Sequence, residues 1–392
     1  MEIKDRSFIE IFFFFSLLFF IVFIPISIAS SQVFYTLSSL LLIIILIKNK
    51  KKIRIPAFFI PLGIYAILTI FSAIFSVRRD ESLKDIKEIL LFLIVILIFN
   101  SIKDTYELKI LNYAISIPII LSSILSFLQF YVFPSIEKRA TGFLSHYMTQ
   151  AGIMLLIFSV SLGLFLGEKK NKKIYWLFIF ILSTLALIFT MTRGAWIGAI
   201  FSAFLIFIIY KPKFALSIPM ALVIFFLVSP ENIKQRALST FSLEDASNRD
   251  RIYMLEAGIK IIKSSPVLGG GPNTIKYLYA DKKYRPAGAK KTNPHLHNNI
   301  IQISAERGIP ALITWLSFII FSFILLYKKW KKSQDPYLKH LSLGILGGVL
   351  GFFISGFFEY NFGDSEVKML FLYLISAPLA IKYNGENGNK KD

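Results

Sequence analysis

The chain has 392 residues, of which 55% are hydrophobic and 16% aromatic. Soluble domains contain about 45–50% apolar residues, so this composition excludes an ordinary soluble protein and indicates an integral membrane protein. The net charge is +20, but the basic residues form short clusters between apolar runs. Membrane topology therefore explains the charge better than nucleic-acid binding does, and no nucleic-acid partner is expected. Cysteine is absent, which excludes disulfides and thiol chemistry.

Apolar runs of about 17 to 25 residues recur along the whole chain, the length a helix needs to cross a bilayer. Alternating barrel strands of about ten residues do not occur, so an all-α polytopic bundle is expected. The first apolar run, of about 20 residues, exceeds the core of a cleaved signal peptide and predicts a retained first span. The eleven further spans, about twelve in all, are expected near 33–47, 56–76, 88–102, 108–132, 147–166, 174–191, 194–210, 214–229, 309–327, 341–359 and 366–382.

Five basic clusters fall in connections on one side of this topology. If both termini are cytoplasmic, all five are cytoplasmic, as the excess of Lys and Arg in inner loops requires. The expected organisation is then spans 1–9 in residues 1–229, a long outward loop in 230–308, and spans 10–12 with a cytoplasmic tail in 309–392. The clusters lie at 48–54, 168–173, 211–213, 328–340 and 389–392.

The length of a membrane-spanning helix predicts two hairpins whose turns, here called tips, face outward. Residues 174–210 form an apolar stretch too long for one span and right for two, so 192–194 must be the tip of a hairpin. The same reasoning makes a hairpin of 341–381. The second tip carries Glu359, Asp364 and Glu366.

The outward loop contains an expected helix in "DRIYMLEAGIKIIKSSP" (250–266), with apolar residues at 252, 255, 259 and 262. Asn248 or Ser247 is the expected cap, and Pro266 lies beyond the end. The "GGGPN" turn that follows either supplies backbone N–H groups to an anion or only connects two helices.

The stretch "NPHLHNNIIQISAERGIPAL" (293–312) predicts another helix start, with Asn293 or Thr292 as cap and Gly308 as its end. His297 is then near the start of a helix outside the bilayer. Three roles are open for it: an interfacial histidine with a hydrogen-bonded partner, a metal ligand with His295, or a general base or acid.

Arg193 is the only charged residue at the first tip. An arginine there either anchors a helix end at the bilayer surface or binds a phosphate at headgroup depth. The second role gains from Arg249 and Arg251 in the neighbouring loop, because guanidinium groups bind phosphate oxygens in a bidentate manner.

Four segments in chain order resemble the O-antigen ligase and polymerase superfamily. One of the four segments consists of two parts. An arginine-led helix and the turn after it, "RIYMLEAGIKIIKSSPVLGG" and "GPNT", occupy 251–274, and "HNNIIQISAERGIPAL" follows at 297–312. The others are "RATGFLSHYMTQAGIML" (139–155), "TRGAWIG" (192–198) and "GFFEYNFGDSEVKML" (356–370), and they cover most of the chain from residue 139 onward.

The resemblance implies a membrane glycosyltransferase of the GT-C type that acts at the periplasmic face of the bacterial inner membrane on a lipid-linked glycan. It implies a catalytic role for His297 and a diphosphate-binding role for Arg193 and Arg251. Leu255 stands where the family often has tryptophan, which keeps Arg249 as an alternative to Arg251. The supporting residues expected from the resemblance and from the tips are Asn298, His146, Gln150, Asp364 and Glu366.

The chemistry of such a site fits these residue types. A polyprenyl diphosphate leaving group needs its developing charge neutralised, which arginines provide, so neither a metal nor another cofactor is expected. An imidazole takes the proton of the acceptor hydroxyl near neutral pH. Asp364 or Glu366 is expected to orient the histidine, the acceptor or an arginine. The leading expectation is an O-antigen ligase that moves a glycan from undecaprenyl diphosphate to the lipid A core of lipopolysaccharide. Alternatives are a repeat-unit polymerase, a protein O-oligosaccharyltransferase and, from another class, a transporter of the same lipid.

Overall fold

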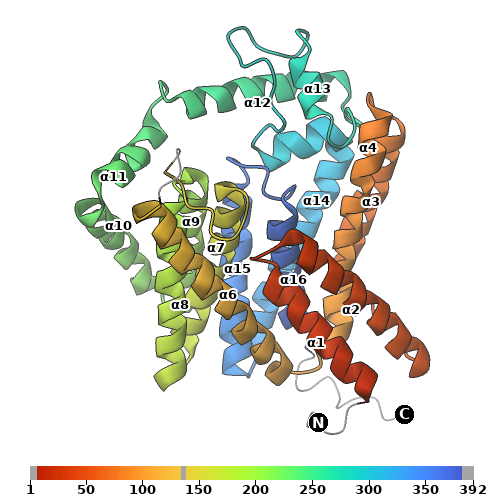
Figure 1. The fold of residues 1–392 in the computed structure, drawn as a ribbon, viewed down its shortest axis with the longest axis vertical. Coiled ribbons are helices and arrows are strands. Elements are labelled where there is room, and N and C mark those ends of the chain that lie inside the picture. Colours follow the sequence, from red (N-terminus) through yellow and green to blue (C-terminus); the bar gives the residue numbers. More distant parts are fainter. Residues whose placement is uncertain (1–6, 134–137, 382–392) are drawn as a thin grey trace.

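The computed structural model describes residues 7–133 and 138–381, and within them every regular element is a helix (Figure 1). The first part of the chain forms α1 (Phe8–Phe23), α2 (Ile28–Lys48), α3 (Phe59–Ile74), α4 (Arg79–Asp85), the 3-10 helix η2 (Ile86–Leu93), α5 (Ile94–Ser101) and α6 (Thr105–Tyr131). The middle part forms α7 (Tyr147–Gly167), α8 (Lys170–Phe189), α9 (Arg193–Tyr210), η3 (Pro212–Leu216), α10 (Ser217–Val228), α11 (Glu231–Leu238), η4 (Ser239–Phe241), α12 (Ala246–Ser264) and α13 (Ile275–Ala280). The last part forms α14 (Asn299–Lys332), α15 (Pro336–Ser355) and α16 (Ser365–Ala380).

Among the described residues, seven helices are long and apolar enough to cross a membrane: α2, α6, α7, α8, α9, α14 and α15. This confirms the all-α, integral membrane class. The other expected spans coincide with shorter helical segments, namely α1, α3, η2 with α5, η3 with α10, and α16. The number of twelve spans stays a prediction.

Both expected hairpins have their turns at the predicted places. Helices α8 and α9 are joined at residues 190–192, and α15 and α16 are joined by residues 356–364. These two turns and the start of α7 lie at the same end of the bundle (Figure 1). The basic clusters at 168–173, 211–213 and 328–340 follow the opposite ends of α7, α9 and α14.

Small residues allow α15 to pack tightly against α7 and α9. A Cβ atom added to Gly198 of α9 would lie 2.5 Å from the carbonyl oxygen of Gly351, and one added to Gly163 of α7 would lie 2.5 Å from Cα of Gly344. Close backbone approach of this kind is how helices associate where lipid removes the hydrophobic drive. The starts of α7 and α9 and the end of α15 are thereby held in a fixed relation.

The segment 230–308 lies over that end of the bundle, with α12 running across the helix ends (Figure 1). Helix α12 is at the expected place, but its cap is Asp245, whose side chain accepts a hydrogen bond from the backbone N–H of Asn248. Its expected apolar face was wrong. Ile252, Leu255 and Ile259 are 50%, 43% and 41% exposed.

The buried face of α12 consists of Met254, Ala257, Gly258 and Ile261. Gly258 shows the reason, because a Cβ atom there would lie 2.2 Å from Cγ2 of Ile301 on α14. Small residues let α14 come close to α12, so the face of α12 that carries them is buried. The positions of the largest apolar side chains do not decide which face of α12 packs against α14.

Helix α14 begins later than expected, at Asn299, with Asn298 as its cap. The chain turns at Gly308, whose φ is +84°, as the sequence predicts. The "GGGPN" turn packs here. The N–H groups of Gly270 and Gly271 donate to the carbonyl oxygens of Ala305 and Glu306, each at 2.8 Å. Because these donors are used, the turn is a helix connection, and its expected alternative as an anion site is wrong.

Candidate active site

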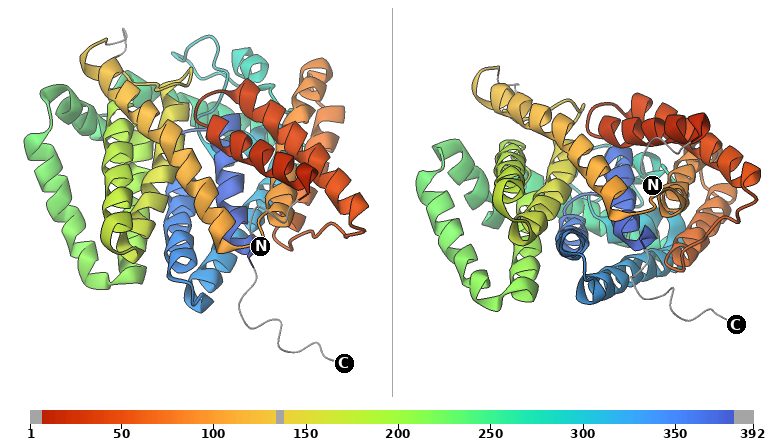
Figure 2. Two further views of the ribbon diagram at one scale, coloured as in Figure 1. Left: turned by 60° about the horizontal axis from the view of Figure 1, so that its bottom comes forward. Right: turned by 90° about the horizontal axis from the view of Figure 1, so that it is seen from below.

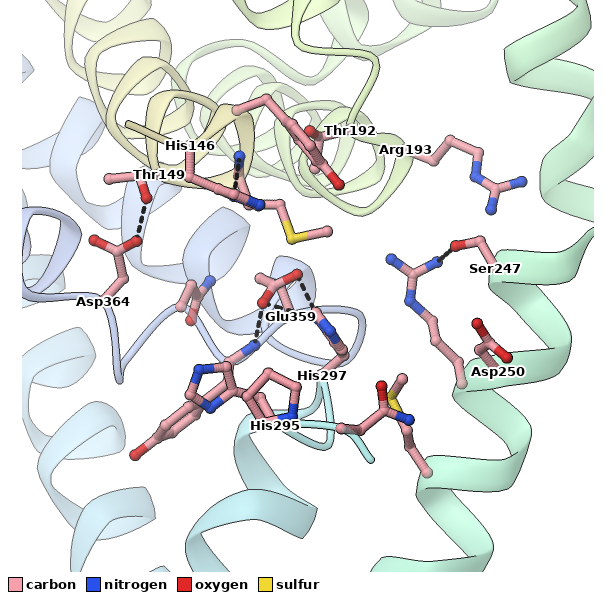
Figure 3. Close-up of a pocket in the computed structure, with 18 of the residues that line it drawn as sticks. His146, Thr149, Thr192, Arg193, Ser247, Asp250, His295, His297, Glu359 and Asp364 are labelled. Carbon is pink, nitrogen blue, oxygen red and sulfur yellow. Dashed lines mark hydrogen bonds and ion pairs between the residues drawn. The ribbon is translucent and has the colours of Figure 1, made fainter. Parts of the chain in front are cut away.

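A polar cavity of about 770 Å³ lies beneath α12, between the helix ends (Figure 3). Its walls come from the starts of α7 and α9, from α11 and α12, from residues 290–297, and from the turn between α15 and α16. Residues distant in the sequence therefore converge on one space. We call this space the polar pocket.

His297 lies directly before the cap of α14 and lines the polar pocket. Its φ of +47° is in the left-handed region, which is uncommon for residues other than glycine. The backbone is fixed by Asn298, whose side-chain oxygen accepts from the N–H of Ile301 and whose amide donates to the carbonyl of Phe357. This backbone conformation turns the imidazole into the pocket (Figure 3).

The imidazole of His297 is paired with Glu359. Its Nδ1 lies 2.9 Å and 3.0 Å from the two carboxylate oxygens. A carboxylate accepts only, so in the neutral imidazole Nδ1 carries the proton and donates it. Nε2 then keeps its lone pair and is the atom able to accept a proton. The arrangement is that of a general base held by an orienting carboxylate.

The carboxylate of Glu359 is held in its ionised form. Burial by itself raises its pKa, but the hydrogen bond and charge of His297 and the charge of Arg251 outweigh burial and leave the pKa below its usual value. The same carboxylate accepts from the backbone N–H of Tyr360. Glu359 therefore carries a negative charge beside the imidazole at neutral pH.

Arg251 projects from α12 into the polar pocket near Glu359. Its Nε donates to the carbonyl oxygen of Phe358 at 3.2 Å, and its Nη1 donates to Ser247 Oγ at 3.0 Å. Burial lowers its pKa, and the charge of Glu359 opposes that shift. Arg249 is not among the pocket-lining residues, so the geometry favours Arg251 between the two arginines.

Arg193 also lines the polar pocket but is held by protein groups. It is 5% exposed, and it donates to Ser239 Oγ at 2.6 Å, to Asp245 Oδ1 at 2.9 Å and to Asn248 Oδ1 at 2.8 Å. A guanidinium has five N–H groups, so three are used in these bonds. Arg193 fastens the loop before α12 onto the start of α9 and leaves its remaining donors for a ligand.

Two further arginines line the polar pocket, Arg139 and Arg236. The Nε of Arg236 donates to the carbonyl of Met191 at 3.0 Å, and its Nη1 lies 3.9 Å from Asp245. Burial and then the charges of Arg139, Arg193 and Arg251 lower the pKa of Arg236 to about 10. Four arginines thus surround one cavity, which favours an anionic ligand.

The supporting residues expected from the sequence divide into two groups. His146 and Asp364 line the polar pocket. His146 caps α7 through Nδ1, and Asp364 accepts from Thr149 Oγ1 at 2.5 Å. Asn298, Gln150 and Glu366 are not among the lining residues. Gln150 is buried in α7, where it bonds to Ser122 and Ser126 of α6.

Of the three partners expected for Asp364 or Glu366, the histidine is the wrong one, and the acceptor and an arginine stay predictions. Asp364 is bonded to Thr149, and Glu359 is the acid that contacts His297. The sequence placed all three acids at one tip but could not rank them, because the fold of residues 356–364 decides which one reaches the imidazole. In that fold, Asn299 accepts from the N–H of Phe362 and donates to the side chain of Asn361, which draws the turn against the start of α14.

Arg139 and Arg236 were missed because nothing in their local sequence separates them from other basic loop residues. The one available signal for Arg139 is its place at the start of the segment 139–155. As for a metal, the described residues contain no group of three or more His, Cys, Asp or Glu side chains placed to hold an ion.

A helical membrane bundle with a polar, arginine-rich pocket at one end defines an integral membrane protein with a candidate catalytic site outside its apolar core. Comparison with known proteins agrees. Residues 178–316 match the family model described as O-Antigen ligase. The resemblance to this family that was drawn from the motifs is thereby confirmed.

Several relatives named "Putative polysaccharide ligase" extend the similarity beyond that domain. The protein from Rickettsia conorii is 25% identical over 334 residues, which is 77% of this chain and 76% of the relative. That from Rickettsia felis is 24% identical over 316 residues, 74% of this chain and 72% of the relative. That from Rickettsia prowazekii is 25% identical over 312 residues, with the same two shares. The similarity to proteins of this name therefore covers about three quarters of the chain.

Proposed function

We propose that the protein is an O-antigen ligase that transfers a glycan from undecaprenyl diphosphate to the lipid A core of lipopolysaccharide. The observation that carries the proposal is the polar pocket, where the His297–Glu359 pair faces Arg251 and Arg193. The pocket holds both parts that such a transfer needs, a base for a hydroxyl and cations for a diphosphate.

The proposed reaction is a single displacement. The acceptor hydroxyl oxygen attacks the anomeric carbon, its proton passes to Nε2 of His297, and a new carbon–oxygen bond forms. The bond from the anomeric carbon to the diphosphate oxygen breaks, and its electron pair leaves with the diphosphate. Attack opposite the leaving group inverts the anomeric centre. Glu359 stabilises the imidazolium that results.

The arginines act on the leaving group. Charge builds on the departing diphosphate oxygen, and fixed guanidinium groups stabilise it with little reorganisation. Arg251 is held by Phe358 and Ser247, and Arg193 by Ser239 and Asp245, so both cations are oriented before the donor binds. In this scheme the arginines do what a divalent metal does in other transferases.

The proposed location is the bacterial inner membrane, with the polar pocket at the periplasmic face and both termini in the cytoplasm. Its support is that three basic clusters follow the helix ends opposite the pocket, as the asymmetry of Lys and Arg in inner loops would require.

An assay of one lipid-linked glycan donor against three acceptors tests the proposal. The acceptors are lipid A core, a second lipid-linked glycan and a serine-containing protein. We expect a conjugate with lipid A core. Product only with the second glycan indicates a repeat-unit polymerase, and product only with the protein indicates an O-oligosaccharyltransferase. Movement of the donor across a vesicle membrane without any product would reject a transferase.

A further inference from the structure

Glu306 lies near the start of α14 and is 2% exposed, and it does not line the polar pocket. Its carboxylate is surrounded by hydrogen-bond donors. The backbone N–H of Asn273 donates to Oε1 at 3.0 Å, and Nε2 of Gln302 donates to the same oxygen at 2.9 Å. Nη1 of Arg307 donates to Oε2 at 2.5 Å. The carboxylate thus accepts in all three bonds, as an ionised acid does.

Gln302 connects this carboxylate to the segment that carries His297. Its Oε1 accepts from the backbone N–H of Leu296, the residue before His297, at 2.6 Å. A backbone N–H only donates, so the amide oxygen must face Leu296 and the amide nitrogen must face Glu306. Gln302 is fully buried, which keeps both bonds from being exchanged for bonds to solvent. We call the connection from Glu306 through Gln302 to Leu296 the histidine arm.

Arg307 connects the same carboxylate to the segment that carries Glu359. Its Nη1, bonded to Glu306, also donates to the hydroxyl oxygen of Tyr360 at 3.1 Å. Tyr360 follows Glu359, and its backbone N–H donates to Oε1 of that acid at 3.1 Å. Nη2 of Arg307 lies 3.7 Å from Asp85, so a second acid holds the guanidinium in place. We call the connection from Glu306 through Arg307 to Tyr360 the glutamate arm.

We propose that Glu306 is a positioning residue for the His297–Glu359 pair. It holds the imidazole through the histidine arm and the neighbouring carboxylate through the glutamate arm. The pair comes from two different helix ends, and its spacing of 2.9 Å is set by a carboxylate that is bonded toward both. The spacing in turn keeps the proton on Nδ1 and the lone pair on Nε2. The effect on catalysis rests on the proposed function, whereas the geometry of the pair does not.

Other bonds near the pair do not make this connection. Asn298 donates to the carbonyl of Phe357, and Arg251 donates to the carbonyl of Phe358. Both bonds hold the turn after α15 against neighbouring helices, but neither reaches the residue before the histidine. The two arms reach both sides of the pair because they begin at the same carboxylate.

One substitution opens each arm. Gln302→Met keeps the length of the side chain and removes both amide bonds. Tyr360→Phe removes only the hydroxyl and keeps the ring beside His295. Ser72→Ala is the matched control, because the buried Ser72 Oγ donates to the backbone carbonyl of Glu306 at 2.8 Å. This control removes a buried hydrogen bond at the same residue and leaves the carboxylate and both arms intact.

The tautomer of His297 is the first measurement. In the full chain labelled with 15N-histidine, the nitrogen shifts distinguish Nδ1–H from Nε2–H, and His297→Gln identifies the signal among the four histidines. At about pH 9, where an ordinary imidazole is neutral, wild type and Ser72→Ala should show Nδ1–H. Gln302→Met and Tyr360→Phe should each show an additional Nε2–H signal, because the carboxylate no longer fixes the proton.

Glycan transfer is the second measurement. A misplacement of about 1 Å from a change outside the site can cost about 100-fold in rate. Gln302→Met and Tyr360→Phe should therefore each lower kcat by about 10- to 100-fold and leave the KM for the donor within about twofold. The variant that combines them should lose no more than about twofold beyond the slower single variant, because one open arm already frees the pair.

The outcomes decide the inference separately from the proposed function. An Nδ1–H signal alone in either folded single variant would overturn it, even if the melting temperature fell. Losses of kcat that multiply in the combined variant would show two independent bonds and overturn it as well. If Gln302→Met does not fold, Tyr360→Phe, which lacks one hydroxyl, decides by its tautomer. The nitrogen shifts need no substrate, so a wild type without transfer activity would reject the proposed function and leave the positioning role to be decided by them.

Discussion

Nδ1 of His297 lies 2.9 Å from the carboxylate of Glu359, although the two residues are 62 positions apart. The two groups come from different helix ends, one before α14 and the other after α15. The pairing fixes the proton on Nδ1 and makes Nε2 the basic nitrogen. A histidine held in this way is suited to remove a proton from a hydroxyl in the polar pocket.

Replacing His297 by alanine should lower kcat by about 10²- to 10⁴-fold, the usual contribution of a general base. Donor binding should stay within about twofold, because the arginines that hold the diphosphate are unchanged. Steady-state kinetics together with direct binding of farnesyl diphosphate measure the two quantities. Near-normal turnover in this variant would reject His297 as the base.

Glu359→Gln should lower kcat by at least about tenfold, since each 1.36 kcal/mol lost from the stabilised imidazolium corresponds to a factor of ten. The glutamine keeps the size of the side chain but removes its charge. Glu366→Gln is the matched control, because this acid of the same tip does not line the pocket. A larger loss of kcat in the Glu366 variant than in the Glu359 variant would show that Glu366, as expected from the sequence, and not Glu359 supports the base.

The stability of the protein should depend on Glu359 in acid. Its pKa in the folded state is below the ordinary 4.5, so its contribution is present above that value and is lost as the pH falls through the lowered pKa. The difference in melting temperature between wild type and Glu359→Gln should shrink as the pH falls below about 4.5. A difference that grows with acid would contradict the assigned direction.

Arg251→Lys should raise the KM for the donor by at least about tenfold, because an ammonium cannot reproduce the bidentate contact of a guanidinium with phosphate. It would also lose the bond from Nε to Phe358, which holds the turn bearing Glu359. Arg249→Lys should change KM by less than about twofold, since Arg249 does not line the pocket. A larger rise in KM for Arg249→Lys than for Arg251→Lys would show that Arg249 is the diphosphate-binding arginine of the loop.

Transfer should persist when divalent metals are removed. Fixed arginines neutralise the leaving group in the proposed scheme, so a chelator should leave the rate within about twofold of the untreated rate. The measurement is glycan transfer by purified protein with and without EDTA, followed by addition of Mg²⁺, Mn²⁺ or Ca²⁺. Loss of activity with restoration by one of these ions would remove the arginine mechanism.

The sequence predicted the features that depend on length and periodicity. The hairpin turns at 190–192 and 356–364 follow from the number of apolar residues that cross a bilayer, and the turn at Gly308 follows from the preference for glycine just after a helix. His297, Arg193 and Arg251 were found from motifs and do converge on one pocket. These features are local, so a single chain segment contains the information.

The predictions that were wrong concern contacts with distant segments of the chain. Ile252, Leu255 and Ile259 have helical spacing and are exposed, because α14 packs instead on the small residues Ala257 and Gly258. The partner of His297 depends on Asn299, which binds Asn361 and thereby places the turn. Such contacts join segments that no local pattern connects.

Gly163 of α7 offers a test of the packing that holds the pocket in place. A Cβ atom there would lie 2.5 Å from Cα of Gly344 and 2.6 Å from the carbonyl of His340, and a backbone cannot move aside as a flexible side chain can. Gly163→Ala should therefore destabilise the protein by about 1–3 kcal/mol and lower its melting temperature in detergent. Gly63→Ala is the control, because in α3 the added methyl would meet only Phe59 Cε1 at 3.8 Å. If both variants melted like the wild type, α7 and α15 would not be in the close contact that aligns the start of α7 with the turn bearing Glu359.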